Sequence, residues 1–255
     1  MDRAVLKFDP VRFVPEEKPT PLIEIPSGVA QVWGFVLDVD GVDRTTATRC
    51  LSREEVERAD RVTSARHRQQ FIVAHVALRT VLSRYCGRPP HALVLQKTSE
   101  GKPFLTGTTA IRFNLTHSHG RALIAVTGDR EVGVDLEKLR PEIDVMRLAD
   151  RFLSSSDRAF IEGGDPAQRH TRFLQAWVIR EAVFKAEGSG MRFPLHHDHV
   201  ELSEDGRTAR LVRGSGRLEG KDLSVRFLSL EPGWVGAVAA EGTDWTVTYR
   251  SFGGS

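Results

Sequence analysis

The sequence predicts an α+β protein built as two similar halves. Short apolar segments bounded by turn residues indicate strands, and longer stretches with apolar residues at helical spacing indicate helices. In each half a strand is followed by helices and then by further strands, although the letters themselves do not repeat. We therefore expect half-domains at residues 29–128 and 129–255, joined near Gly128 to Arg130, with a small-molecule site between them.

Residues 1–28 precede the first half and contain five prolines. Repeated proline excludes regular helix, so we expect a proline-rich arm that is extended or partly disordered.

The formal net charge of the 255 residues is +2, which favours no class of partner, and no nucleic-acid-binding module is recognisable. Cys50 and Cys86 lack zinc or CxxC spacing, and no apolar run resembles a signal peptide or a membrane span. We expect a cytoplasmic monomer that uses neither membrane nor nucleic acid.

Helix signals are clearest in the first half. Ser52 and Glu55 form a capping box that opens a short helix, which is expected to end near Asp60. An apolar stripe predicts a longer helix that ends before Gly87 and Pro89-Pro90. The expected elements are a strand at Val29 to Val36, a helix at Ser64 to Tyr85, and strands at Ala92 to Gln96, Ile111 to Leu115 and Leu123 to Thr127.

The second half repeats this order with a long helix of its own. That helix is predicted from Gln168 to Glu187 and is followed by Gly188, a residue typical of helix ends. The other expected elements are a strand at Val132 to Leu136, a helix at Ile143 to Phe152, a capped turn at Ser154 to Asp157, and strands at 200–202, 223–230, 234–240 and 245–249.

Two acids lie in the strand that opens the second half. Side chains alternate along a strand, so Asp135 and Glu137 project to one face while their apolar neighbours take the other. Two carboxylates on one face repel, and a hard divalent cation that prefers oxygen ligands offsets the repulsion. Glu181 on the long helix adds a third acid, with Lys185 one turn further along the same helix face. These residues suggest a Mg²⁺ site for a phosphorylated substrate, with Lys185 on the phosphate.

Each of these features also has an ordinary structural interpretation. The strand acids are compatible with a solvated face. Glu181 and Lys185 are compatible with a helix salt bridge worth about 0.2–0.5 kcal/mol. The polar turn at 113–120 can hold phosphate oxygens through hydroxyl, imidazole and amide groups, or can simply be a satisfied loop. The histidines at 196–199 point to alternate faces as they enter a strand, which argues against a metal site there.

Four motifs follow one another along the chain: Gly101-Lys102-Pro103, Phe113 to Ser118, Gly133 to Lys138, and Trp177 to Gly190. Taken together and in this order, they resemble the Sfp-type 4'-phosphopantetheinyl transferases. The resemblance runs from about Val29 into the C-terminal strands and leaves out the proline-rich arm. Three positions depart from the usual pattern: Thr116 replaces a serine, Arg180 replaces a lysine, and His75 replaces a helix arginine.

The resemblance implies a pseudo-dimer of two α+β halves, with coenzyme A in the cleft between them and Mg²⁺ as cofactor. The implied partners are apo acyl or peptidyl carrier proteins, usually acidic, which the arginines between Arg49 and Arg88 would attract. The implied site residues are Asp135, Glu137 and Glu181 as Mg²⁺ ligands; His117 and Lys185 as pyrophosphate contacts; Arg58, Lys97, Gly101 and Lys102 at the adenosine end and 3'-phosphate; and Asn114 and Thr116 along the approach.

The expected reaction moves the 4'-phosphopantetheine arm of coenzyme A to a carrier-protein serine and releases 3',5'-ADP. Glu181 is the expected base for the serine hydroxyl, with His117 and Lys185 as the other catalytic groups. Two other functions compete with this one. A nucleotide pyrophosphohydrolase would use the same acids on water, and a non-catalytic binder of coenzyme A or of carrier protein would have no need of a base.

Overall fold

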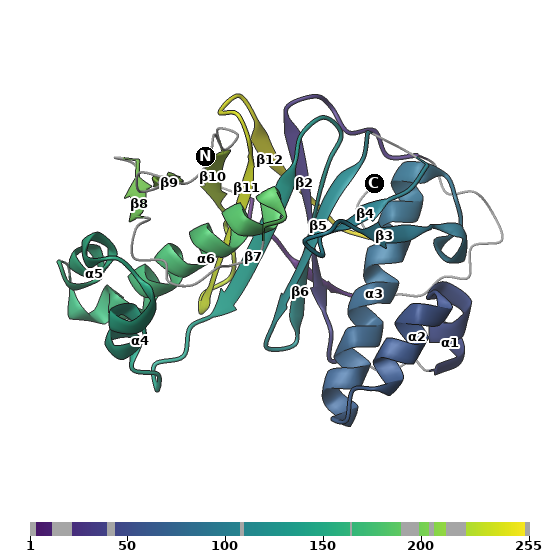
Figure 1. Cartoon of the computed structure of the whole chain (residues 1–255), viewed down its shortest axis with the longest axis horizontal. Helices are drawn as coiled ribbons and strands as arrows, with labels where there is room; N and C mark the ends of the chain where they lie inside the picture. The colour runs from purple at the N-terminus through teal and green to yellow at the C-terminus, as the bar shows by residue number, and fades with distance from the viewer. Residues whose placement is uncertain are drawn as a thin grey trace.

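A computed structural model describes residues 4–11, 22–39, 44–107, 110–163, 165–189, 199–203, 207–212 and 223–252 (Figure 1). It contains helices and strands in both halves, which confirms the predicted α+β class. The helices are α1 Arg44–Cys50, α2 Arg53–Asp60, α3 Ala65–Cys86, α4 Val145–Phe152, α5 Ser155–Glu162 and α6 Arg169–Glu187, with 3-10 turns at Pro90–Ala92 and Pro166–Gln168. The strands are β1 Phe8–Pro10, β2 Val29–Val36, β3 Leu95–Lys97, β4 Pro103–Leu105, β5 Arg112–Ser118, β6 Arg121–Thr127, β7 Val132–Lys138, β8 His199–Leu202, β9 Thr208–Val212, β10 Leu223–Phe227, β11 Trp234–Glu241 and β12 Thr246–Arg250.

Local sequence signals account for the ends of the helices. The capping box of Ser52 and Glu55 opens α2 as predicted, and Ser64 caps the start of α3. Gly87 ends α3 at φ 62° and Gly188 ends α6 at φ 74°, in the left-handed region where glycine is favoured. These two long helices are therefore confirmed to within a residue or so of their predicted ends.

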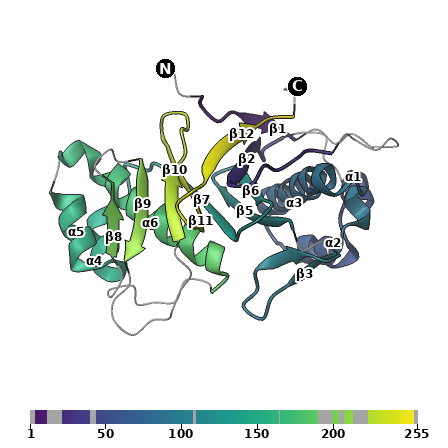
Figure 2. The same ribbon diagram turned by 90° about the horizontal axis from the view of Figure 1, so that it is seen from above.

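The first sheet draws on both ends of the described chain. β2 pairs with β6 and β6 pairs with β5, both antiparallel. On the other side of β2, β1 and β12 run parallel to it, β12 along Val29 to Trp33 and β1 along Gly34 to Val36 (Figure 2). The start of the arm is thus an extended strand, whereas residues 12–21 lie outside the described part of the chain. The last strand of the second half completes the sheet of the first.

The second sheet follows the order β7-β11-β10-β9-β8 and is antiparallel throughout. The two sheets pack face to face around a core shared by both halves, which includes Val32 and Leu123 from the first sheet and Val134 and Val238 from the second. α3 covers the outer face of the first sheet, and α6 covers the outer face of the second (Figure 1). The layers are therefore helix, sheet, sheet and helix, and β5 and β7 each lie at the edge of their own sheet.

Several predicted elements differ from the structure. The turn predicted at Ser154 to Asp157 is a capping box that continues into helix α5. The strand predicted at 92–96 begins at Leu95, because Pro89-Pro90 starts a 3-10 turn first. α1, β1, β4 and β9 were not predicted; each has eight residues or fewer, too short for a clear periodic pattern. Of the histidine stretch at 196–199, residues 196–198 lie outside the described part of the chain.

None of the described helices combines the length and the apolar character that a membrane-spanning segment needs.

Candidate active site

The paired acids lie on β7 as the strand alternation predicts. Val134 and Leu136 are fully buried in the core between the two sheets. Asp135 and Glu137 project from the opposite face, and Asp135 is only 3% exposed. A buried carboxylate needs hydrogen-bond donors or a positive partner, because burial without one is costly.

Alternate residues of β5 supply such donors along the edge of β7. Thr116 Oγ1 donates to Asp135 Oδ1 over 3.0 Å, and Ser118 Oγ donates to Glu137 Oε2 over 2.9 Å. Asn114 Oδ1 accepts a hydrogen bond from the backbone N–H of Val134 over 3.1 Å. Three side chains two residues apart therefore fasten the edge of the first sheet to the edge of the second.

Helix α6 brings a cation and the third acid to the same place. Lys185 Nζ lies 2.6 Å from Asp135 Oδ1 and 3.1 Å from Thr116 Oγ1. It also lies 4.0 Å from Glu181 Oε2, which confirms that Lys185 and Glu181 share one helix face. α6 approaches β7 so closely at Gly133 that a Cβ there would overlap the backbone of Ala182 and Ala186. Glycine is what allows this approach.

The three acids influence one another electrostatically. Burial raises the pKa of Glu137, and the neighbouring charge of Asp135 raises it further. Burial is also the main cause of the raised pKa of Glu181; Lys185 opposes it, and Asp135 and Glu137 add to it. The raised pKa values of Glu137 and Glu181 thus reflect burial first and repulsion between neighbouring carboxylates second, and a bound cation or a proton would offset both.

Asp135, Glu137 and Glu181 offer carboxylate oxygens of the kind that Mg²⁺ binds, but these oxygens do not surround one common point in the structure. Among the described residues, no three His, Cys, Asp or Glu side chains are grouped so that they could hold a metal ion. Asp135 Oδ2 is nevertheless buried and accepts no hydrogen bond from the described residues, while Lys185 occupies the other oxygen. Carboxylate oxygens are the ligands that Mg²⁺ takes from proteins. The predicted set of Asp135, Glu137 and Glu181 therefore remains a prediction that requires side-chain rearrangement.

His117 lies on the opposite face of β5, toward α3. There the rings of Phe71 and His75 stack with centroids 3.9 Å apart, and the guanidinium of Arg58 lies 5.3 Å from the Phe71 ring centre. Partial burial lowers the pKa of His117, and the positive charges of Lys185 and His67 lower it further. Burial likewise lowers the pKa of His75, and the positive charges of Arg58 and His117 lower it further. Arg58, Phe71 and His75 therefore form one stacked cluster along α2 and α3.

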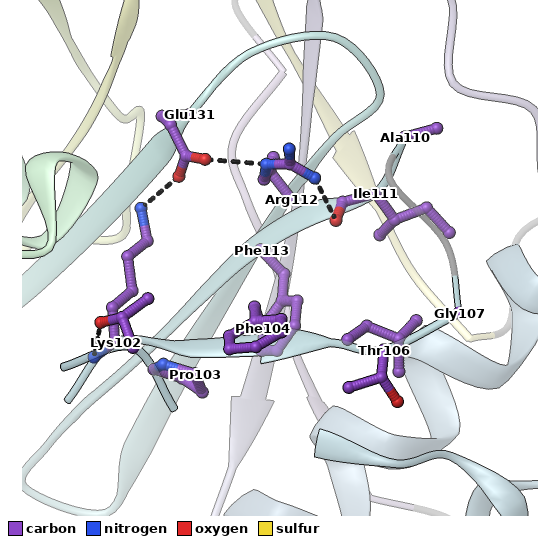
Figure 3. A pocket seen from close by; sticks show the side chains of 12 residues that line it. Lys102, Pro103, Phe104, Thr106, Gly107, Ala110, Ile111, Arg112, Phe113 and Glu131 are labelled. Atoms are coloured by element: carbon purple, nitrogen blue, oxygen red, sulfur yellow. Dashed lines mark hydrogen bonds and ion pairs between the residues drawn. The ribbon is translucent and has the colours of Figure 1, made fainter. Parts of the chain in front are cut away.

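A pocket of about 790 Å³ opens beside the turn that contains Gly101 and Lys102 (Figure 3). Gly101 turns the chain at φ 91°, and its N–H donates to the carbonyl of Thr98. Lys97 is exposed on β3, next to this turn. Lys102 lines the pocket, but its ammonium already donates to Glu131 Oε2 and to the carbonyls of Val132 and Ala186. Its predicted contact with the adenosine end remains a prediction.

Residues 42–239 of the chain match models of known protein families. A model of the 4'-phosphopantetheinyl transferase superfamily matches residues 131–239, and a model of the 4'-phosphopantetheinyl transferase N-terminal region matches residues 42–130. The 4'-phosphopantetheinyl transferase HetI of Nostoc sp. is 33% identical over 174 residues, which cover 67% of this chain and 73% of that protein. The chain belongs to the 4'-phosphopantetheinyl transferase superfamily.

Two further relatives show how widely this phosphopantetheinyl transferase family is spread. The 4'-phosphopantetheinyl transferase Sfp of Bacillus subtilis is 25% identical over 195 residues, which cover 76% of this chain and 84% of that protein. The L-aminoadipate-semialdehyde dehydrogenase-phosphopantetheinyl transferase of Xenopus laevis is 27% identical over 168 residues, 61% of this chain and 55% of that protein. The likeness predicted from sequence to the Sfp-type phosphopantetheinyl transferases is confirmed.

The structure also shows residues of this phosphopantetheinyl transferase that sequence reasoning missed. Ser118 is predicted only as part of a motif, yet its hydroxyl donates a hydrogen bond to Glu137. Its position two residues after Thr116 on the same strand places both side chains on one face, and this spacing could have indicated the contact. Glu131 and Arg112 form an ion pair that no motif indicates. Arg180, which replaces the usual lysine, is fully buried and bonded to Asp157 of α5, so it faces away from Asp135 and toward the helix packing.

Proposed function

We propose that the chain transfers the 4'-phosphopantetheine group of coenzyme A to a serine of apo acyl or peptidyl carrier proteins and releases 3',5'-ADP. Membership of the phosphopantetheinyl transferase family supports the reaction. The observation that carries the proposal at this site is the meeting of β5, β7 and α6 at Asp135, where Lys185 and Thr116 both contact Oδ1. The Lys185 ammonium and a cation held by the acids would together offset the negative charge of the pyrophosphate.

The proposed overall arrangement is a pseudo-dimer that binds coenzyme A between its halves. Both halves open with a strand and continue through three helices into further strands, and in both the first strand pairs antiparallel with a later strand of the same half: β2 with β6, and β7 with β11. This common layout supports two related half-domains at residues 29–128 and 129–255. The edges of the two sheets meet at the site, so a ligand placed there would contact both halves.

The proposed metal ligands are Asp135, Glu137 and Glu181. The uncompensated Asp135 Oδ2 and the raised pKa values of Glu137 and Glu181 support a cation at this position. Mg²⁺ bound there would neutralise phosphate charge and charge that develops on the leaving group. For this to happen, the Lys185 ammonium must leave Asp135 Oδ1, which frees it to donate to a phosphate oxygen.

In the proposed reaction the serine Oγ attacks the phosphorus that carries the pantetheine arm. A new O–P bond forms as the bond from that phosphorus to the 3',5'-ADP oxygen breaks, and the leaving group takes the electron pair. Glu181 accepts the serine proton, and its position on the α6 face that carries Lys185 to Asp135 supports this role. Lys185 and His117 hold the pyrophosphate oxygens, and Asn114 and Thr116 line the approach.

The adenosine end is proposed to lie toward the turn at 98–103 and the pocket beside it. Arg58 and Lys97 supply positive charge for the 3'-phosphate, and Gly101 leaves room for a close approach because no atom lies within 4 Å of its Cβ position. The apolar walls of the pocket include Pro103 and Phe104, which suit the face of a purine. Lys102 would join these contacts by changing its hydrogen-bond partners.

Product analysis tests the proposal against its two competitors. The chain is incubated with coenzyme A and Mg²⁺, with and without an apo carrier protein, and 3',5'-ADP is measured; a parallel reaction contains EDTA. We expect 3',5'-ADP only with both carrier protein and Mg²⁺. Release of 3',5'-ADP and phosphopantetheine without carrier protein would show a pyrophosphohydrolase instead, and tight binding of coenzyme A without any product would show a binder.

A further inference from the structure

The carboxylate of Glu131 holds two cations of the first half. Glu131 lies between β6 and β7; its Oε2 is 2.6 Å from Lys102 Nζ, and its Oε1 is 2.7 Å from Arg112 Nε (Figure 3). Burial alone would raise the pKa of Glu131, but the hydrogen bonds and charges of Lys102 and Arg112 outweigh it and leave the pKa lowered. The side chain is therefore an ionised bridge between β5 and the turn before β4.

Lys102 extends this bridge to the end of α6. Its ammonium also donates to the carbonyl of Ala186 over 2.6 Å, and that carbonyl lies in the last turn of the helix, where carbonyls lack partners within the helix. The methylene carbons of Lys102 pack beside Gly188, so that a Cβ at residue 188 would lie 3.1 Å from Lys102 Cδ. Lys102 thus serves as a C-terminal cap for α6, and only 11% of its side chain is exposed.

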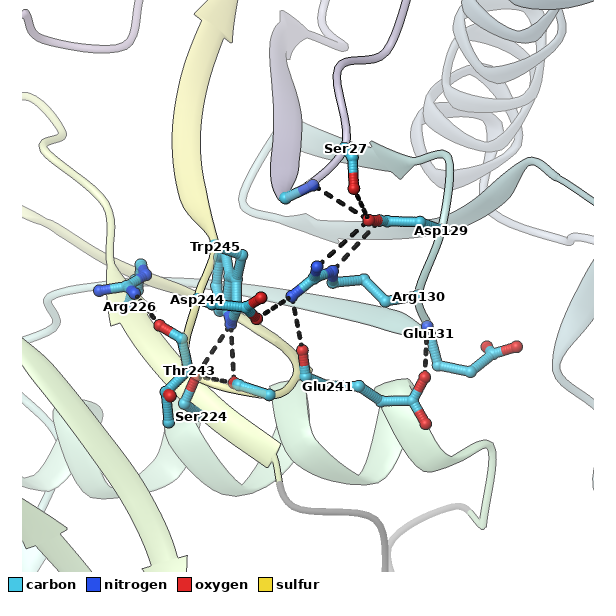
Figure 4. A network of polar contacts seen from close by, with 12 residues as sticks. Ser27, Asp129, Arg130, Glu131, Ser224, Arg226, Glu241, Thr243, Asp244 and Trp245 are labelled. Atoms are coloured by element: carbon cyan, nitrogen blue, oxygen red, sulfur yellow. Dashed lines mark hydrogen bonds and ion pairs between the residues drawn. The ribbon is translucent and has the colours of Figure 1, made fainter.

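The backbone at Glu131 is anchored in the second half. Its N–H donates to Glu241 Oε2 at the end of β11 over 3.1 Å. The preceding residue, Arg130, donates to Asp129, to the carbonyl of Glu241 and to Asp244 Oδ1 (Figure 4). Glu131 is therefore a fixed point rather than a loose surface acid, and a side chain on a fixed backbone can hold its partners in place.

We infer that Glu131 is a positioning residue for phosphopantetheine transfer. By holding Lys102 against the last turn of α6, it sets how Lys185 and Glu181, on the two preceding turns, lie relative to Asp135. The inference rests on the proposed function, because Lys185 and Glu181 act on the substrate only in that reaction. A small displacement of such groups is enough to slow chemistry.

Kinetics and hydrogen exchange test this inference together. Glu131→Gln keeps the shape of the side chain but removes its charge, and Lys102→Met keeps the packing on Gly188 but removes the ammonium. We expect kcat to fall about tenfold in each variant. KM for coenzyme A should change less than about twofold in Glu131→Gln, whereas Lys102→Met should also raise KM, because Lys102 is itself proposed to contact the adenosine end. The double variant should be no worse than Lys102→Met alone, because both changes break one connection.

Amide hydrogen exchange gives a readout that does not depend on turnover. Exchange in a peptide that covers residues 183–188 should be about tenfold faster in Glu131→Gln and in Lys102→Met than in the wild type. Glu201→Gln is the matched control, since it breaks an exposed ion pair with Arg210 on β9, and it should leave both exchange and kcat unchanged.

Two outcomes would overturn the inference. The first is unchanged kcat and unchanged exchange in folded Glu131→Gln. The second is a normal kcat with only a raised KM in Lys102→Met, which would leave Lys102 a contact of coenzyme A without any positioning role. If one variant fails to fold, the other decides between these results. A wild-type chain without transferase activity would refute the proposed function, while the exchange data would still report whether Glu131 holds α6.

Discussion

Asp135 shows how much one side chain depends on its surroundings. It is on β7, yet its Oδ1 accepts hydrogen bonds from Thr116 of β5 and from Lys185 of α6. Two acids on one strand face need a positive group nearby, and Lys185 supplies one in this structure. The ammonium was predicted on the same helix face as Glu181, but its bond to Asp135 depends on how closely α6 packs on β7.

Gly133 controls that packing and gives a test at a single residue. In Gly133→Ala the new Cβ would overlap the carbonyl of Ala182 and the amide nitrogen of Ala186, which are backbone atoms held within the helix. α6 must therefore move away from β7. We expect the free energy of unfolding to fall by about 2–3 kcal/mol, measured by chemical denaturation.

The control for this substitution is Gly128→Ala, whose added Cβ would meet Ile25 at 3.4 Å, an ordinary contact distance. It should change the free energy of unfolding by less than about 1 kcal/mol. Equal stability of Gly133→Ala and wild type would contradict the close approach of helix and strand on which the position of Lys185 depends.

Among the elements, the sequence predicts best those whose signals are local. α2 and α3 begin at capping residues, and α3 and α6 end at glycines, so each boundary follows from one or two residues. β7 follows from its alternation of apolar and acidic residues. The capping box of Ser154 and Asp157 predicts only a turn by itself, whereas in the structure eight helical residues, Ser155–Glu162, follow Ser154. β1 and β12 depend on a partner strand far away in the chain, which no local signal reveals.

At the site, too, local sequence patterns predict some residues, whereas the roles of others depend on partners far away in the chain. The acids, Lys185 and the polar residues of β5 could be named from sequence because they fall at regular spacings on two strands and a helix. The role of Arg180 could not be predicted, because Asp157 and Ser154, which surround it at the junction of α5 and α6, are brought there by tertiary packing. The links from Glu131 to Lys102 and Arg112 likewise join residues 29 and 19 positions apart.

At the scale of the whole molecule, the two halves are joined by a shared core and by the linker between them. Asp129 accepts hydrogen bonds from Ser27 and from the N–H of Gly28, and its neighbour Arg130 reaches the β11–β12 turn (Figure 4). The arm, the linker and the turn between β11 and β12 are thereby tied together. We expect the halves to unfold in a single cooperative transition.

The pH dependence of stability tests this junction. The hydrogen bond from Arg130 is the main cause that lowers the pKa of Asp129 from 3.8 to about 2, with further help from Gly28 and Ser27. A lowered pKa stabilises the fold above pH 3.8, and this contribution is lost as the pH falls through about 2. Because Asp129 is partly exposed and screened, we expect Asp129→Asn to lose about 1 kcal/mol at pH 6.

The difference between wild type and Asp129→Asn should shrink as the pH is lowered from 5 toward 2, because the wild-type carboxylate then becomes protonated. Chemical denaturation at several pH values measures it. A stability difference that stays constant over this range would show that Asp129 does not contribute through its charge.

The intact mass of an apo carrier protein tests the central claim most directly. After incubation with coenzyme A, Mg²⁺ and the wild-type chain, the carrier protein should gain the mass of one phosphopantetheine group. Glu181→Gln should remain folded and produce no such gain, whereas Glu162→Gln, which alters an exposed pair with Arg158, should behave as wild type. Full modification of the carrier protein by Glu181→Gln would contradict the account.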